Sequence, residues 1–351
     1  MVSKPKGCKV VNCKWIFKIK LGPNGQVKCY KARLVAKGFS QVEDINFNET
    51  YSPVVGHSTV RTLLALACTN SWHIHQIDAK LAFLNRDLKE EIYIKILPGQ
   101  DRPKEHVWQL RKALYGLKQA LQEWYTKVHE VMVGLEYKAL VADNCVFIYI
   151  DANGHLIIVA VYVDDFLFIS KSLKFVESSK SEISGHFEMK NLGLAKWILQ
   201  MELNHDISNG ITTLSQSQYT EKILERHRMA NSWPIKTSID SNITLLSLAA
   251  SEIDITEYQQ YVGSLIHAMV WTCPDIAYAV GIVLRYTATS RQAHMTIKII
   301  ESRLSSFLFY FLFLFLFQLI FHFSIFRTLG LGLEVIDHIS HIWECGHNIW
   351  L

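Results

Sequence analysis

The chain has 351 residues, of which 50% are hydrophobic, and its formal net charge is +4. That length can hold about two domains' worth of buried core, and so weak a net charge excludes a protein that coats nucleic acid through bulk charge alone. The seven cysteines are scattered without a Cys-x-x-Cys pair, which favours reduced thiols inside the cell over a disulfide framework or a zinc module.

Two strands, residues 9–20 and 26–37, are the first predicted elements. The five residues between them contain Pro23 and the pair Asn24-Gly25, which are strong turn formers. Basic and aromatic residues interleave along both strands, a pattern typical of nucleic-acid contacts but equally of a solvated amphipathic hairpin, so both interpretations stay open. The patch comprises Lys9, Lys14, Lys18, Lys20, Lys28, Lys31, Arg33 and Lys37 with Trp15, Phe17 and Tyr30.

Helical periodicity recurs further along the chain, between stretches that read as strands. Apolar residues at intervals of three and four predict helices over residues 60–70, 109–134, 172–185 and 217–228. Strands joined by hairpins and alternating with these helices predict an α+β fold, with an antiparallel sheet packed on helices.

Two adjacent carboxylates, Asp164 and Asp165, interrupt an apolar, β-prone run from Leu156 to Ile169. Burial of unpaired charge is costly, so a divalent cation is expected to hold the two acids there. The run predicts two short strands with a tight turn at the acids. Because side chains alternate between the faces of a strand, the two aspartates cannot have identical roles.

A third acid, Asp78, ends a strand-like stretch, residues 72–77, and precedes a helix-compatible segment. Mg²⁺ prefers carboxylates and water, and it usually binds one or two carboxylates together with substrate phosphates. Each aspartate alone would be a turn or cap residue. Two acidic strand ends together suit a centre in which two ions, Mg²⁺ or Mn²⁺, clamp the attacking and leaving oxygens of a phosphoryl transfer.

The tetrapeptide Tyr162-Val163-Asp164-Asp165 resembles the catalytic box of reverse transcriptases, and an ordered series of further blocks is similar to the Pol polyproteins of copia-type retrotransposons. A tetrapeptide alone would be weak support, but the order of the blocks over about residues 1–300 is specific. These blocks are Cys13–Lys18, Tyr30–Phe39, Gln76–Lys80, Lys112–Ala120, Phe187–Gly193, Leu214–Tyr219 and Pro274–Ala279.

The resemblance implies a fingers, palm and thumb architecture with an antiparallel palm sheet. Residues 1–240 would form the fingers, starting inside that region, and the palm. Residues 241–302 would form a helical region that resembles the connection toward ribonuclease H. Residues 303–351 fit nothing in the family and are expected to be an aberrant hydrophobic tail.

The implied activity is RNA-directed DNA polymerisation, with an RNA or DNA template-primer and deoxynucleoside triphosphates as partners. By resemblance, Asp78 and Asp164 would coordinate both metal ions, and Asp165 would be a weaker or transient ligand. Phe83, five positions after Asp78, matches the bulky residue that lies under the incoming sugar and blocks a 2′-hydroxyl. Ordinary core packing would explain Phe83 without that spacing.

The resemblance also implies a set of substrate-binding residues. Arg33 and Lys31 would reach the triphosphate, the guanidinium by bidentate contact and the ammonium as a point charge. Gln119 matches the position that contacts the incoming nucleotide and template, and Tyr162 belongs to the catalytic box. Residues 192–202 resemble the hairpin that positions the primer end, although apolar packing would explain that segment equally well.

Two segments depart from the family pattern. Leu81–Arg86 replaces Thr-Ala-Phe-Leu-x-Gly, and Gln119–Trp124 replaces Gln-Ala-Pro-Arg-x-Trp. The second segment loses a proline and a basic residue and gains Glu123, which should weaken binding of a polyanionic template. The alternative function is therefore a catalytically inactive retroelement remnant that at most binds nucleic acid.

The run Phe307–Phe326 is uncharged and long enough to span a bilayer. Its near-alternating Phe and Leu also match translated pyrimidine-rich noncoding DNA, which is the preferred explanation and argues against a membrane partner. A true anchor would form one continuous helix from about Ser305. With no apolar stretch among the basic first 14 residues to act as a secretory signal, the expected location is a cytoplasmic particle or the nucleus.

Overall fold

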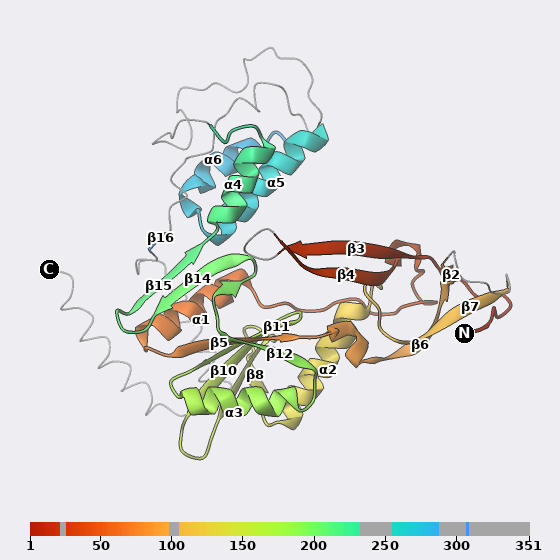
Figure 1. The fold of residues 1–351 in the computed structure, drawn as a ribbon, viewed down its shortest axis with the longest axis horizontal. Coiled ribbons are helices and arrows are strands. Elements are labelled where there is room, and N and C mark those ends of the chain that lie inside the picture. Colours follow the sequence, from red (N-terminus) through yellow and green to blue (C-terminus); the bar gives the residue numbers. More distant parts are fainter. Residues whose placement is uncertain (22–25, 98–104, 232–254, 288–306, 309–351) are drawn as a thin grey trace, which may run out of the picture. The chain divides into compact units, whose positions relative to one another are not determined.

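The computed structural model describes residues 1–21, 26–97, 105–231, 255–287 and 307–308 (Figure 1). The described chain divides into two compact units. The first unit contains residues 1–56 and 73–193, and the second contains residues 57–72 and 194–308.

A six-stranded sheet forms the centre of the first unit, with the strand order β12-β5-β11-β10-β9-β8. The central pairings, β5 with β11, β11 with β10, and β10 with β9, are antiparallel, as expected from the sequence. The strands are β5 (His73–Ala79), β8 (Lys138–Ala139), β9 (Val146–Ile150), β10 (Leu156–Tyr162), β11 (Asp165–Ser170) and β12 (Met189–Leu194).

Two helices, α2 (Ala120–Gly134) and α3 (Leu173–Ser184), pack against one face of this sheet (Figure 1). Phe166 and Phe168 of β11 share a buried core with Trp124 of α2 and Val176 of α3. Ile77 lies opposite Phe166 in the β5–β11 pairing and belongs to the same core. The sheet therefore has an apolar face under the helices, and the residues that alternate with these point to its other face.

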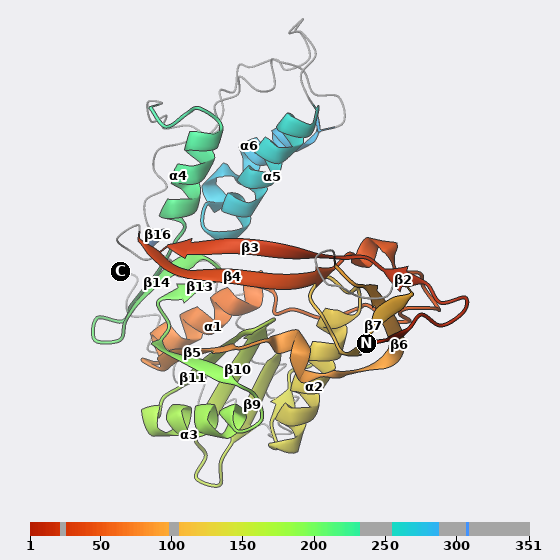
Figure 2. The ribbon, with the colours of Figure 1, turned by 45° about the vertical axis from the view of Figure 1, so that its right-hand side comes forward.

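The predicted N-terminal hairpin is confirmed as β3 (Cys13–Leu21) paired with β4 (Val27–Ala36) (Figure 2). Its two faces differ in chemistry because partners in the register share a face. Phe17 and Tyr30 lie on an apolar face and are 76% and 77% exposed. Lys31 and Arg33 lie on the opposite face, where Lys31 pairs with Lys18.

A smaller four-stranded sheet in the first unit has the order β1-β7-β6-β2. Its strands are β1 (Val2–Ser3), β2 (Val10–Val11), β6 (Asp87–Lys95) and β7 (His106–Lys112). The helix predicted from residue 109 is wrong at its start, because residues 106–112 pair with β6 and α2 begins only at Ala120. A non-local strand pairing here overrides the local helical periodicity.

Gly116, between β7 and α2, lies against the end of β4. The Ala36 amide donates to the Tyr115 carbonyl at 2.8 Å, and a Cβ built on Gly116 would lie 2.1 Å from the Ala36 carbonyl oxygen. The facing residue, Gly38 of the 3-10 helix η1 (Gly38–Ser40), is crowded in the same way by the Gly116 carbonyl. The loop before α2 can approach β4 only because both positions lack a side chain.

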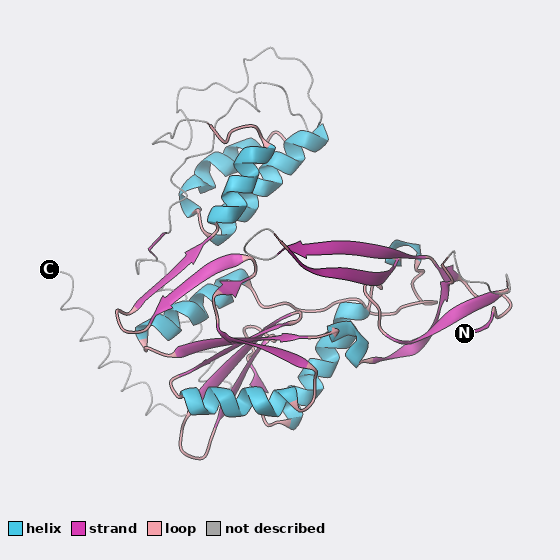
Figure 3. Cartoon of the chain, in the orientation of Figure 1, coloured by secondary structure: helices cyan, strands magenta, loops and turns pink. Residues whose placement is uncertain are grey.

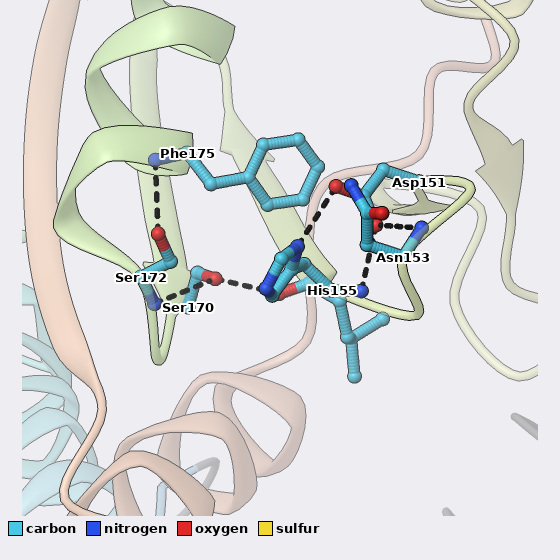
Figure 4. Close-up of polar contacts among 7 residues, drawn as sticks. Asp151, Asn153, His155, Ser170, Ser172 and Phe175 are labelled. Carbon is cyan, nitrogen blue, oxygen red and sulfur yellow. Dashed lines mark hydrogen bonds and ion pairs between the residues drawn. The ribbon is translucent and has the colours of Figure 1, made fainter.

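At the end of the sheet remote from Asp164, polar contacts fasten the β9–β10 turn and the start of α3 (Figure 4). Asp151 accepts hydrogen bonds from the backbone amides of Asn153 and His155, at 2.9 and 2.8 Å, and its carboxylate also contacts the His155 ring. These bonds, the His155 side chain first, lower the pKa of Asp151 to about 2. Ser172 caps α3 by accepting from the Phe175 amide.

Within its described residues, the second unit combines a sheet with helices α1, α4, α5 and α6 (Figure 3). Buried aromatic and aliphatic side chains of α4, α5 and α6, among them Ile223, Tyr258 and Val280, form its core. The helices are α1 (His57–Thr69), α4 (Ser217–Arg226), α5 (Ile255–Trp271) and α6 (Ala277–Leu284), with a 3-10 turn η3 (Pro274–Ile276). The strands, in order, are β13 (Trp197–Ile198), β14 (Met201–Asp206), β15 (Ile211–Ser215) and β16 (Phe307–Leu308).

The hydrophobic run near the C-terminus is described only at its first two residues. Phe307–Leu308 pair with β15 as a strand, so the helix expected of a membrane anchor does not include them. The rest of the run, and nearly all of residues 303–351, lie outside the described residues. No helix in the described ranges is both long and apolar enough to cross a membrane.

Replacement of Gly116 by Ala should destabilise the first unit strongly. Gly116 has a φ of +88°, and Gly154, at the β9–β10 turn, has a φ of +80° but no heavy atom within 4 Å of a built Cβ. Both substitutions incur the cost of a positive φ, about 1–2 kcal/mol, but only Gly116→Ala adds overpacking of about 1–3 kcal/mol. Chemical unfolding of the two variants measures the difference, and equal free energies of unfolding would contradict the close approach.

Candidate catalytic carboxylate site

The hairpin of β10 and β11 closes through two residues, because Tyr162 pairs directly with Asp165 and only Val163 and Asp164 lie between them. Val163 has a φ of +55°, a conformation that two-residue hairpin loops need but that a β-branched residue resists. The Asp164 carbonyl accepts a hydrogen bond from the Ala79 amide at 2.7 Å. The predicted tight turn is thus confirmed, one residue earlier than the sequence indicated because Asp165 already belongs to β11, and it is bonded to the end of β5.

The neighbouring strand brings the third acid to the turn. Asp78 lies opposite Asp165 in the β5–β11 register, so the two side chains share one face of the sheet, with Cβ atoms about 4.5–5.5 Å apart as in any such pair. That face is opposite the helix-covered core, since Ile77 and Phe166, one residue along each strand, point into the core. The structure therefore brings Asp78, Asp164 and Asp165 together, as expected.

Burial and repulsion between neighbouring carboxylates shift Asp78 and Asp165 toward protonation. Burial, followed by the charges of Asp164 and Asp78, raises the pKa of Asp165 to about 6, against a hydrogen bond from Gln76. Gln76 Nε2 donates to Asp165 Oδ1 at 2.9 Å. The pKa of Asp78 is also raised, first by burial and then by Asp164. A nearby positive charge stabilises carboxylates that are held close together against their mutual repulsion.

The three acids do not form a closed metal cage. Across the described ranges of the chain, no group of three or more His, Cys, Asp or Glu side chains is placed to hold a metal ion. A cation that arrives with a triphosphate needs only one or two protein carboxylates, and Asp78 and Asp164 are the candidates for that donor set. Asp165 offers less, because one of its oxygens already accepts from Gln76.

Cationic residues of the β3–β4 hairpin act on the acids. The charges of Lys31 and Lys20 oppose the rise in the pKa of Asp78. The pKa of Lys31 itself is lowered, first by burial and then by repulsion from Lys20 and Arg33. The positive charges on the basic face of the hairpin and the negative charges of the carboxylates therefore partly offset each other.

Tyr115 joins these groups, although the sequence analysis did not single it out. The Arg33 guanidinium lies over the Tyr115 ring, 5.2 Å from its centroid. Burial and then the charge of Asp164 raise the pKa of Tyr115. Phe83, on the 3-10 helix η2 (Ala82–Asn85), packs edge-to-face on the same ring, with centroids 4.6 Å apart. Tyr115 lies inside the family block Lys112–Ala120, and that block was the sequence signal that could have identified it.

Comparison with known proteins identifies the family. Residues 1–241 match the family model described as reverse transcriptase (RNA-dependent DNA polymerase). The chain belongs to this family. It is 39% identical, over 84% of its length, to the retrovirus-related Pol polyprotein from transposon TNT 1-94 of Nicotiana tabacum, and 34% identical, over 80%, to that from transposon RE2 of Arabidopsis thaliana. The resemblance to copia-type Pol polyproteins is confirmed, and the matched regions span 23% and 19% of those two relatives.

One residue of the reverse transcriptase pattern lies apart from the acids. Gln119 is fully buried, its Nε2 donates to the Asn46 carbonyl at 2.8 Å, and its Oε1 accepts from Gln41 Nε2 at 3.0 Å. Both ends of the amide are therefore engaged in holding residues 41–46. This geometry favours a role in fixing that loop over the direct nucleotide contact that the resemblance implied.

The two departures from the family pattern meet in space. Arg86 Nε donates to Glu123 Oε2 at 3.2 Å, and Arg86 Nη1 donates to Glu130 Oε2 at 2.5 Å. Glu123 is only 4% exposed. The expectation that Glu123 repels a template loses its basis, because its charge is buried against the arginine that replaces the family glycine. Removal of Arg86 would leave Glu123 as an uncompensated buried charge, whereas Arg86 would keep Glu130 if Glu123 were removed.

Proposed function

We propose that this chain is the polymerase part of a retrotransposon Pol protein and acts as an RNA-directed DNA polymerase. In the reaction, the primer 3′-oxygen forms a bond to the α-phosphorus of a deoxynucleoside triphosphate. The bond from that phosphorus to the β-phosphate oxygen breaks, pyrophosphate leaves, and the hydroxyl proton passes to solvent. The observation that carries the proposal is the β5–β11 register, which sets Asp78 opposite Asp165 and beside Asp164.

Within this proposal, Asp78 and Asp164 would hold Mg²⁺ or Mn²⁺, and Asp165 would be a weaker ligand. The donor set fits a hard cation, since it consists of carboxylates, and the pKa of Asp78 is raised first by burial and then by the charge of Asp164. When bound, the ions would supply charge stabilisation at the attacking and leaving oxygens. Asp165, which accepts a hydrogen bond from Gln76, would add negative charge to the site and hold the end of β11 in place.

The incoming nucleotide would bind between the acids and the basic face of the β3–β4 hairpin. Arg33 suits a triphosphate because its planar guanidinium can contact two oxygens at once, and its position over the Tyr115 ring limits its freedom. Lys31, on the same face, would add a point charge. Tyr162, half-buried at the end of β10, would lie at the edge of this site.

Template and primer would bind the same unit. Strands β3 and β4 carry basic residues and no acidic ones. The exposed rings of Phe17 and Tyr30 offer faces on which bases can stack. We assign the β3–β4 hairpin to fingers and the six-stranded sheet to a palm within residues 1–240. Residues 241–302 would follow the palm toward the ribonuclease H connection, and a Pol protein of this kind would act in a cytoplasmic particle or the nucleus.

The direct test is nucleotide incorporation by the purified full chain on a primed RNA template with Mg²⁺. Wild type should extend the primer, and Asp164→Asn should lose at least about a hundredfold in rate, because the substitution removes a carboxylate that would hold the ions beside the reacting phosphate. Asp151→Asn is the matched control, since that acid belongs to the remote β9–β10 turn. Template binding without extension by wild type would instead identify an inactive remnant.

Phe83 would act as the sugar gate of this polymerase. Its ring packs on Tyr115, whose pKa responds to both Asp164 and Asp78, so it borders the site rather than lying wholly in the core. Phe83→Ala should raise ribonucleotide use relative to deoxynucleotide use by about tenfold or more, the scale of one pocket group. Phe83→Tyr retains the ring and should retain selectivity. An unchanged ratio in folded Phe83→Ala would reject the gate.

A further inference from the structure

A buried tryptophan reaches the turn that carries the acids. Trp124 on α2 is 1% exposed, and its indole Nε1 donates to the Val163 carbonyl at 2.6 Å. The ring packs edge-to-face on Phe187, with centroids 5.1 Å apart. The helix that covers one face of the sheet is thus hydrogen-bonded to the peptide that precedes Asp164.

The turn at Val163-Asp164 needs contacts from residues outside it to hold its conformation. Val163 has a φ of +55°, and a non-glycine residue in such a conformation costs about 1–3 kcal/mol. Branching at Cβ makes this conformation still less favourable. A turn under this strain persists only when its surroundings fix it.

Two bonds to the turn come from opposite directions. The indole of Trp124 holds the Val163 carbonyl, and the Ala79 amide holds the carbonyl of the next residue, Asp164. Two consecutive peptide planes are therefore fixed, one by α2 and one by the end of β5. Between them lies the Cα of Asp164, so the direction of its side chain is set by both bonds.

We infer that Trp124 is a positioning residue that holds the strained turn at Val163 and thereby aims the Asp164 carboxylate. The inference deepens the proposed function, on which the catalytic part of it rests. Trp124 contacts neither nucleotide nor metal in this role, because it acts through the backbone of Val163. Loss of the indole N–H, rather than loss of ring volume, is the event that would release the turn.

The variant Trp124→Phe separates these two roles, because it keeps an aromatic ring and removes the donor. Trp271→Phe is the matched control, a buried tryptophan of α5 in the second unit. The double variant Trp124→Phe with Val163→Gly tests the strain directly, since glycine adopts a positive φ without cost and should need less fastening.

Hydrogen exchange of the metal-free full chain, followed by mass spectrometry, gives a readout that requires no activity. The Ala79 amide reports the turn, because it donates to Asp164. Trp124→Phe should speed exchange in peptides covering residues 74–80 and 160–168 by about tenfold, the scale of one lost hydrogen bond. Trp271→Phe should leave those peptides unchanged, and the added Val163→Gly should recover part of the protection.

Incorporation kinetics give the second readout. Trp124→Phe should lower kcat by about tenfold or more with little change in the KM for the nucleotide, and the double variant should regain part of that loss. Unchanged exchange at residues 74–80 and 160–168 in Trp124→Phe would overturn the inference whatever the kinetics. An inactive wild-type chain with the expected exchange pattern would reject the proposed function and leave the turn-holding role standing.

Discussion

The antiparallel pairing of β5 with β11 is the constraint on which the rest of the site depends. Alternation along the two strands sends Ile77 and Phe166 into the core under α2 and α3, and it sends Asp78 and Asp165 to the opposite face. A slip of one residue would place Asp78 in the core and Ile77 at the site. Hydrophobic burial on one face therefore fixes the register, and the register brings the carboxylates together on the other.

The arrangement has an electrostatic cost that the surrounding residues partly offset. Burial and repulsion raise the pKa of Asp165 and Asp78, whereas Lys31 and Lys20 act in the opposite direction on Asp78. The same lysines repel each other, which contributes to the lowered pKa of Lys31. A ligand of opposite sign would stabilise each set of charges: a cation would stabilise the acids, and a phosphate would stabilise the lysines. A metal–triphosphate complex carries both.

Much of this could be predicted from sequence, because the signals were local. Turn chemistry predicted the β3–β4 hairpin, and the β-prone run predicted a turn at Asp164-Asp165, one residue after the observed turn at Val163-Asp164. Three-to-four spacing predicted α3 to within one residue at each end. Two acidic strand ends suggested one shared metal centre, and the resemblance then assigned Asp78 and Asp164 to it. Residues 106–112 were misread as helix because their strand pairing with β6 is non-local.

Side-chain partners across the fold were the least predictable part. Nothing near Gln119 in sequence indicates that its amide is used by Gln41 and Asn46, more than 70 positions away. The pairing of Arg86 with Glu123 likewise joins the two segments that depart from the family pattern, and neither segment alone indicates its partner. The positive charge of Arg86 and the negative charge of Glu123 compensate each other, so both departures leave paired charges in the fold.

We propose that Asp78 and Asp164, brought together by the β5–β11 register, hold a divalent cation that binds with a nucleotide. Manganese titration of the full chain, followed by electron paramagnetic resonance with and without a deoxynucleoside triphosphate, tests it most directly. We expect nucleotide-dependent Mn²⁺ binding that is lost in Asp78→Asn and in Asp164→Asn but kept in Asp151→Asn. Equal Mn²⁺ binding by wild type and the two site variants would contradict the claim.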